Sequence, residues 1–260
     1  MIRALMLSLL VICSISSKSQ DVVKDFQKYT YFIFGWKNNA GKGCASGFFL
    51  KKNNKVYFIT AGHVITQIDP ITNLADPNAP DSMRIRVFNN KNQVEFFTII
   101  RSKMNLPKKG KKPYAYPDVY KVPITRTDLA NFQINYLNDL YDKYDVRNGT
   151  PDKIYIYGFD CSRSTSVASE TVTSLFREGT MKGVIGNVPV YSNIWGAKNQ
   201  RDTLNYLANL NVEQGFSGAP VLFKFIDRKT QKVKYTFGGI LSAKMPDNSF
   251  CFIVRPEYVK

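Results

Sequence analysis

Histidine is almost absent from this chain, which has one, His63, among 260 residues. Cysteine is also scarce, and the four cysteines stand far apart in the sequence. Structural zinc sites use closely spaced cysteine and histidine ligands, so this pattern excludes a zinc site of that kind. No metal, nucleotide or flavin motif occurs, and we expect no cofactor.

Acidic residues are outnumbered, with 20 Asp and Glu against 36 Lys and Arg, which gives a formal net charge of +16. Such a balance favours encounters with polyanions such as nucleic acid, anionic envelope surfaces or acidic proteins. The lysines are scattered apart from the run at residues 108–112, which is more typical of a solvated loop than of a binding patch. A polyanion contact through the basic surface is therefore an open expectation.

Long apolar runs are missing except at the start, where a short basic segment precedes an apolar run over Ala4–Ile15. Small and polar residues follow, as in a secretory signal peptide. We expect a signal over residues 1–19, cleaved before Gln20, although cleavage after Ser16 also fits. The run is too short for a comfortable membrane span, and no later segment predicts one. The chain is therefore expected to be exported, either secreted or periplasmic.

The cysteines leave two questions open. Cys13 suggests a lipoprotein anchor as a rival to signal cleavage, but the bulky Ile12 before it disfavours this reading. Removal of the leader leaves Cys44, Cys161 and Cys251, an odd number that allows at most one internal disulfide. Three buried thiols that pack as small apolar groups are the favoured interpretation.

The rest of the chain is rich in short strand patterns, with 44% hydrophobic and 13% aromatic residues. Turn-rich segments are expected at residues 41–43, 69–82 and 104–117. Many short strands without alternating long helices favour an all-β barrel or sandwich and argue against a parallel α/β sheet. The strand candidates are residues 29–36, 45–50, 55–60, 83–89, 94–101, 119–124, 153–159, 167–176, 179–185, 206–212, 220–225, 235–241 and 250–254.

One segment departs from the strand pattern. Apolar residues between Asp128 and Tyr144 recur at helical spacing, which predicts a helix or an irregular linker. The expected organisation is a first half over about residues 28–127, a linker over about 128–150 and a second half over about 151–260.

His63 follows the apolar run Val56–Ile59 and lies in the small-residue segment Thr60–Val64. Histidine is the side chain whose ordinary pKa allows proton exchange near neutral pH. A partly buried histidine at the end of a strand is the structural alternative, and this segment alone does not decide between them.

A second segment of interest is Gln214–Pro220, in which Gly215 and Gly218 flank Ser217. Glycines permit a tight turn in which neighbouring N–H groups point at one spot. Acyl transfer needs an exposed nucleophile and such N–H donors for the oxyanion, for which the amides of Gly215 and Ser217 are the natural pair. Similar turns are also common in proteins without catalytic activity.

The segments Thr60–Val64, Asp118–Val122 and Gly215–Pro220 together resemble the three catalytic blocks of chymotrypsin-like (trypsin-fold) serine peptidases, in that family's chain order. The resemblance implies two antiparallel β-barrels with the active site in the cleft between them. It also implies a protein or peptide substrate and an exported serine endopeptidase of the bacterial type.

The resemblance assigns three roles. His63 would take the proton of Ser217 and later protonate the leaving amine, while Asp118 would orient the imidazole. Asp128 and Asp139 are competitors for the aspartate role, but only Asp118 opens a strand-like segment.

The substrate-binding residues implied by the resemblance are Asn211, Ser242, Ala243 and Lys244. Asn211 falls near the expected floor of the primary specificity pocket. Ser242 matches a position that supports the aspartate and lines the cleft. Lys244 suggests, as a hypothesis, a preference for acidic residues on the substrate.

Three features depart from the family pattern. Phe216 stands where digestive members carry an aspartate that pairs with a newly cleaved N-terminus, so that activation step should be missing. Val64 replaces a cysteine, so the disulfide that brackets the histidine is missing too. The chain ends at Lys260, short of the usual C-terminal helix, which leaves closure of the second barrel open.

Two other functions compete with the peptidase. A catalytically inactive trypsin-fold protein could bind a polyanion or a protein partner through its basic surface, although such proteins usually lose one residue of the triad. A lipase or esterase would need the same triad on another fold and in another chain order.

Overall fold

The computed structural model describes most of the chain after residue 20. The described residues are 21–38, 40–66, 79–104, 118–138, 150–161, 174–183, 205–244 and 250–259. The expected signal, the lysine run at 108–112 and the competitor Asp139 lie outside these ranges. No helix among the described residues combines the length and the apolar character that a membrane crossing needs.

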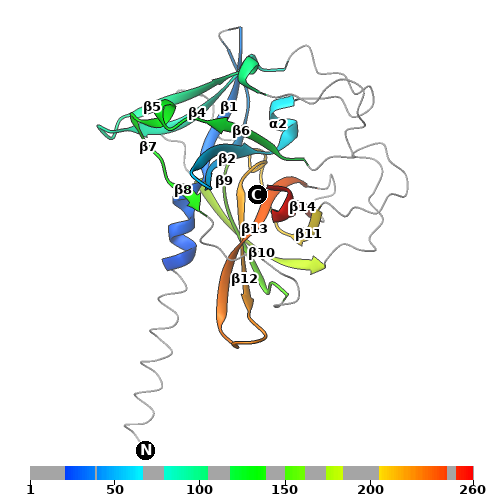
Figure 1. Cartoon of the computed structure of the whole chain (residues 1–260). Helices are drawn as coiled ribbons and strands as arrows, with labels where there is room; N and C mark the ends of the chain where they lie inside the picture. The colour runs from blue at the N-terminus through cyan, green and yellow to red at the C-terminus, as the bar shows by residue number, and fades with distance from the viewer. Residues whose placement is uncertain are drawn as a thin grey trace, which may run out of the picture.

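The first half forms an eight-stranded sheet that curls on itself, drawn in the upper part of Figure 1. Its strands run in the order β5-β4-β1-β2-β3-β6, with β7 paired to β4 and β8 paired to β2. The elements of this half are helical residues 21–26, η1 (Gln27–Tyr29), β1 (Tyr31–Lys37), β2 (Ala40–Lys52), β3 (Lys55–Thr60), α2 (Gly62–Thr66), β4 (Ser82–Asn89), β5 (Val94–Ile100), η2 (Arg101–Lys103), β6 (Tyr120–Ile124), η4 (Thr127–Leu129), β7 (Phe132–Gln133) and β8 (Tyr136–Asn138).

The second half forms a closed six-stranded barrel, drawn in the lower part of Figure 1, in the order β10-β11-β14-β13-β12-β9. Its elements are β9 (Lys153–Phe159), β10 (Ser174–Gly183), β11 (Asn205–Asn209), β12 (Pro220–Ile226), β13 (Val233–Lys244), β14 (Cys251–Val254) and α3 (Pro256–Val259). The expected all-β, double-barrel architecture is confirmed.

Each half has its own core, and a third cluster joins them. Phe49 lies in the first core, with its ring centroid 5.0 Å from that of Tyr31 and 4.9 Å from that of Phe58. The third cluster lies at the seam between the halves and is called the seam cluster below. In it, Phe48 of β2 contacts Phe237 of β13, with centroids 5.6 Å apart. Burial of these apolar side chains provides most of the force that docks one half on the other.

The turn expected at residues 41–43 is instead part of β2. The chain reverses at residue 38, where Asn38 has a φ of +49°. The β1–β2 pairing shifts register after Phe34, so Gly43 is the extra residue of a β-bulge and adopts a φ of +63°. Glycine is favoured in both a turn and a bulge, which explains why the pattern did not separate them.

The sequence allowed a helix or an irregular linker over Asp128–Tyr144, and the described part of this segment contains no α-helix. Residues 127–138 form η4, β7 and β8, and β8 runs parallel to β2 with Leu137 buried in the seam cluster. The apolar side chains of this segment pack into different core clusters. Their spacing in the sequence nevertheless matches the period of a helix, which explains the prediction.

The second barrel closes through β14, which pairs with both β11 and β13. Among the described residues, the four-residue α3 follows it. Val259 of α3 is fully buried in the seam cluster.

The packing predicts a difference between two phenylalanines of the first sheet. Replacing the fully buried Phe49 by Ala should destabilise the protein by about 3–5 kcal/mol, because it leaves a cavity among aromatic rings. Phe88→Ala is the matched control, since Phe88 is 44% exposed, and should change stability by less than about 1 kcal/mol. Urea unfolding measures both; equal effects would contradict the described core.

Candidate active site

Two adjacent strand ends bring His63 and Asp118 together. β3 ends at Thr60, and His63 follows in the short helix α2. Asp118 precedes β6, which pairs with β3 so that Tyr120 lies opposite Thr60. The segments that flank this pair therefore lie side by side, although they are distant in sequence.

The carboxylate of Asp118 makes two hydrogen bonds to His63. The backbone N–H of His63 donates to Oδ1 at 2.8 Å, and ring Nδ1 lies 2.7 Å from Oδ2. A proton on Nδ1 leaves Nε2 as the acceptor, which is the arrangement that a general base requires. A Cβ at Gly62 would stand 2.9 Å from Oδ1, so a larger residue there would crowd the pair.

The second barrel contributes a third bond to the same carboxylate. The hydroxyl of Ser242, on β13, donates to Oδ2 of Asp118 at 2.5 Å. The supporting contact expected of Ser242 is therefore present. The competitor Asp128 instead accepts a bond from the amide of Thr125 in an exposed turn.

These contacts shift both pKa values. Burial acts to lower the pKa of His63, but the charge and the hydrogen bond of Asp118 raise it above the ordinary value of 6.5. Burial acts to raise the pKa of Asp118, but the charge of protonated His63 and the bonds from His63 and Ser242 lower it to about 2. Asp118 is thus ionised throughout the neutral range, and His63 keeps its proton to a higher pH than a free imidazole does.

Ser217 lies in a glycine turn that packs against the segment leading to His63. Gly215 and Gly218 have φ values of +109° and +86°, in the region that favours glycine. A Cβ at Gly218 would lie 2.2 Å from the hydroxyl of Thr60 and 2.8 Å from the amide nitrogen of Ala61. The close approach places the turn that carries Ser217 next to the end of β3, just before His63.

The two amides expected to form an oxyanion site belong to this turn. Among the described residues, the N–H groups of Gly215 and Ser217 donate to no backbone carbonyl, whereas the amides of Phe216 and Gly218 do. Free N–H groups on alternate residues of a fixed turn are suited to binding an oxyanion.

Phe216 anchors the turn in the second core. Its side chain is fully buried, and a Cβ at Gly158 of β9 would lie 2.4 Å from the ring. An aromatic ring therefore fills the position where the resemblance has an aspartate. Apolar packing, which needs no cleaved N-terminus, holds this residue.

The other expected substrate-binding residues lie in the second half, before the turn that carries Ser217 and at the end of β13. Asn211 is exposed and precedes Val212, whose carbonyl accepts a 3.0 Å hydrogen bond from Nζ of Lys244. Lys244 is exposed at the end of β13, and Ala243 before it is partly buried.

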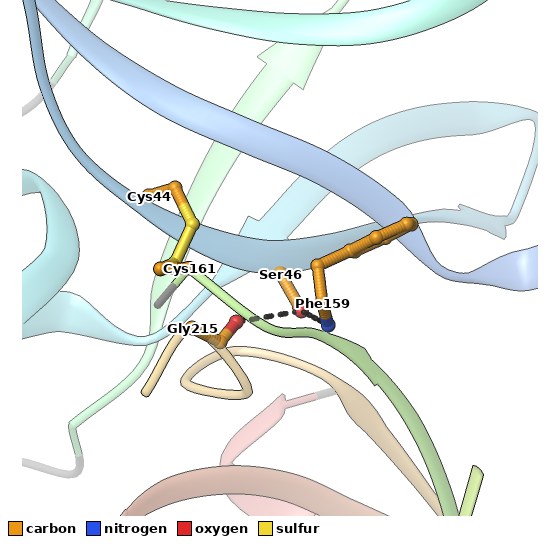
Figure 2. The surroundings of a disulfide bond; sticks show 5 residues. All are labelled: Cys44, Ser46, Phe159, Cys161 and Gly215. Carbon is orange, nitrogen blue, oxygen red and sulfur yellow. Dashed lines mark hydrogen bonds between the residues drawn. A yellow bond between two sulfur atoms is a disulfide. The ribbon is translucent and has the colours of Figure 1, made fainter. Parts of the chain in front are cut away.

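The interpretation of three separate thiols is wrong. Cys44 of β2 and Cys161, just after β9, form a disulfide between the two halves, with Cα atoms 5.8 Å apart (Figure 2). Cys251 is free and buried. The cysteines are 117 residues apart, and only the docked fold brings them together.

Sequence reasoning also missed Ser46. Figure 2 shows its hydroxyl between the carbonyl of Gly215 and the amide of Phe159, both in the second half. A serine before a glycine in an aromatic strand carries no signal of this role, because its partners are distant in sequence.

The contacts of Asp118 predict a shift that NMR can follow directly, since His63 is the only histidine of the chain. Asp118→Asn removes the carboxylate charge but leaves the burial, so the pKa of His63 should fall below 6.5. The exposed Asp128→Asn is the control and should leave it unchanged. An Asp118→Asn protein with the wild-type His63 pKa would refute the described pairing.

No protein-family model and no curated protein sequence matches this chain. A solved structure of the serine endoprotease from Yersinia pestis is similar over 90% of this chain, with 12% sequence identity and a TM-score of 0.47, and this chain spans 60% of its length. The active form of the Rv3671c protease from M. tuberculosis is similar over 92% of this chain and 80% of that one, with 14% identity and a TM-score of 0.48. Likeness at this level carries no functional argument, so we infer function from this chain's own residues.

Proposed function

We propose that this chain is a serine endopeptidase of chymotrypsin-like type, which hydrolyses peptide bonds through an acyl-enzyme. The observation that carries the proposal is the hydrogen-bonded pair of His63 and Asp118, which lies beside a glycine turn holding Ser217. The pair supplies a base that is already oriented. The turn supplies a nucleophile next to two N–H donors that have no backbone acceptor among the described residues.

In the proposed reaction, Oγ of Ser217 attacks the carbonyl carbon of the substrate while Nε2 of His63 takes the hydroxyl proton. The resulting oxyanion accepts hydrogen bonds from the amides of Gly215 and Ser217, each of which lowers the barrier by about 3 kcal/mol. His63 then gives its proton to the leaving amine. Water, activated by the same imidazole, hydrolyses the acyl-enzyme and restores Ser217.

Asp118 has an electrostatic and positioning role in this scheme. Its two bonds to His63 hold the ring and the tautomer, and its charge stabilises the imidazolium that forms. Ser242 holds the same carboxylate from the second barrel, so the orientation of the base depends on the docking of both halves.

We also propose that the peptidase acts outside the cytoplasm. The N-terminal sequence has the order of charged, apolar and small residues that secretory signals show. The Cys44–Cys161 disulfide supports this setting, because disulfides persist mainly in oxidising compartments.

Covalent labelling tests the nucleophile. A fluorophosphonate probe should label the wild-type protein, and Ser217→Ala and His63→Ala should abolish labelling without unfolding the chain. Ser174→Ala on β10 is the control and should label normally. A folded wild-type protein that is not labelled would favour the alternative, a binding protein without catalysis.

The pH dependence of kcat/KM tests the base. Only neutral His63 can accept the proton, so activity should fall with acid as one group protonates, with a midpoint above 6.5 because Asp118 raises the pKa of His63. A neutral peptide substrate keeps other titrations out of the profile. An acid limb centred near pH 4 would assign the loss to a carboxylate instead.

Lys244 supports a finer proposal on specificity. The ammonium donates one of its three N–H groups to the carbonyl of Val212, and we propose that another binds a substrate carboxylate. Cleavage of a peptide library should favour acidic residues near the cleaved bond, and Lys244→Ala should weaken this preference by up to about fivefold, the size of an exposed ion pair. A preference for basic residues would refute the proposal.

A further inference from the structure

Ser46 of β2 lies fully buried at the seam and bonds two backbone groups of the second half. Its hydroxyl donates to the carbonyl of Gly215 at 2.8 Å and accepts from the amide of Phe159 at 3.2 Å (Figure 2). Its own amide donates to the carbonyl of Ser217 at 2.9 Å. One side chain and one amide of the first half thus hold the turn that carries the nucleophile.

In this turn, hydrogen bonds to the backbone carbonyls determine where the amides of Gly215 and Ser217 point. The C=O and N–H of a trans peptide point in opposite directions, so a held carbonyl fixes the amide of the next residue. The carbonyl of Gln214 accepts from the amide of Cys161 at 2.8 Å, which turns the amide of Gly215 away from Cys161. The carbonyl of Phe216 accepts from the amide of Ala219 at 2.9 Å, which directs the amide of Ser217 the other way.

The peptide between those two is the one that Ser46 holds. It joins Gly215 to Phe216, and its carbonyl is the acceptor of the Ser46 hydroxyl. The ψ of Gly215 and the φ of Phe216 set the orientation of the two flanking peptides, which carry the amides of Gly215 and Ser217, relative to each other. A change in either angle would therefore alter how these two amides point. Gly215 has a φ of +109°, and a glycine can adopt many other backbone conformations because it has no Cβ. A hydrogen bond is therefore needed to hold this peptide in one orientation.

The contact on Gln214 also depends on β2. Its partner Cys161 is bonded through the disulfide to Cys44, two positions before Ser46. Thr60, near His63, donates to the carbonyl of Ser46 at 2.8 Å. The segment Cys44–Ser46 thus links the turn that carries Ser217 to strand β3, which leads to His63.

We propose that Ser46 is a positioning residue that holds the Gly215–Phe216 peptide and so keeps the amides of Gly215 and Ser217 aimed at one oxyanion. This inference rests on the proposed peptidase function. It implies that the oxyanion site is completed by the first half, although both of its donors belong to the second. The site is therefore competent only when the two halves are docked.

Kinetics of Ser46→Ala test the role in catalysis. Loss of alignment weakens a contact made only in the transition state, so kcat should fall about 10- to 100-fold on a slow amide substrate while KM changes less than about twofold. A peptide aldehyde, whose adduct carries an oxyanion, should lose affinity by the same factor. The NMR pKa of His63 should stay at its wild-type value, because the His63–Asp118 pair is untouched.

Ile33→Val is the matched control, since Ile33 is fully buried on the neighbouring strand β1 and the change also removes a few buried atoms. It should leave kcat, KM and aldehyde affinity unchanged. A Ser46→Ala enzyme with wild-type kcat and aldehyde affinity, in a protein that labels at Ser217, would overturn the inference and leave the proposed function standing.

Hydrogen exchange gives a readout that needs no activity. The amides of Phe216, Gly218 and Ala219 are hydrogen-bonded within the turn region and should exchange about tenfold faster in Ser46→Ala, the effect of losing about one buried hydrogen bond. Exchange at wild-type rates would show that Ser46 does not hold the turn and would refute the inference. If the wild-type protein neither labels nor turns over substrate, the proposed function fails, and the catalytic role of Ser46 fails with it.

Discussion

The carboxylate of Asp118 is the point on which the candidate site depends. It accepts bonds from the amide and the ring of His63 within the first half, and from Ser242 in the second. A carboxylate with little access to water is unfavourable unless its oxygens are hydrogen-bonded, so these three donors offset the loss of hydration. Because two donors come from the first half and one comes from the second, the ionised state of Asp118 and the docking of the halves support each other.

The contact between the two halves is mainly apolar. The polar contacts between the halves depend on the relative position that this apolar contact fixes. Phe48 and Phe237 meet in a cluster that draws on both halves, which fixes how β2 lies against the barrel. From that position β2 presents Ser46 to the nucleophile turn and Cys44 to Cys161. The nonpolar cluster provides most of the free energy, and the hydrogen bonds select one arrangement of the turn. Changes at the seam, far from the substrate, should therefore affect catalysis as well as stability.

Much of this fold was predictable because its signals are local. Alternating apolar residues predicted most strands. Of the three motif segments, the structure places His63 against Asp118 and Gly218 against Thr60 and Ala61. Most features that were predicted wrongly or missed involve contacts between distant segments. The disulfide, the strand β8 and the contacts of Ser46 depend on partners distant in sequence, about which a single sequence carries no pairing information. Glycine at residue 43 was ambiguous because a turn and a bulge require the same backbone conformation.

Intact-mass spectrometry during turnover of a peptide ester can show whether Ser217 is a nucleophile that forms an acyl-enzyme. We expect a burst of product equal to the enzyme concentration, together with an acyl adduct that peptide mapping places on Ser217. Linear product release without any adduct, from a folded protein with its His63–Asp118 pair intact, would contradict this role of Ser217.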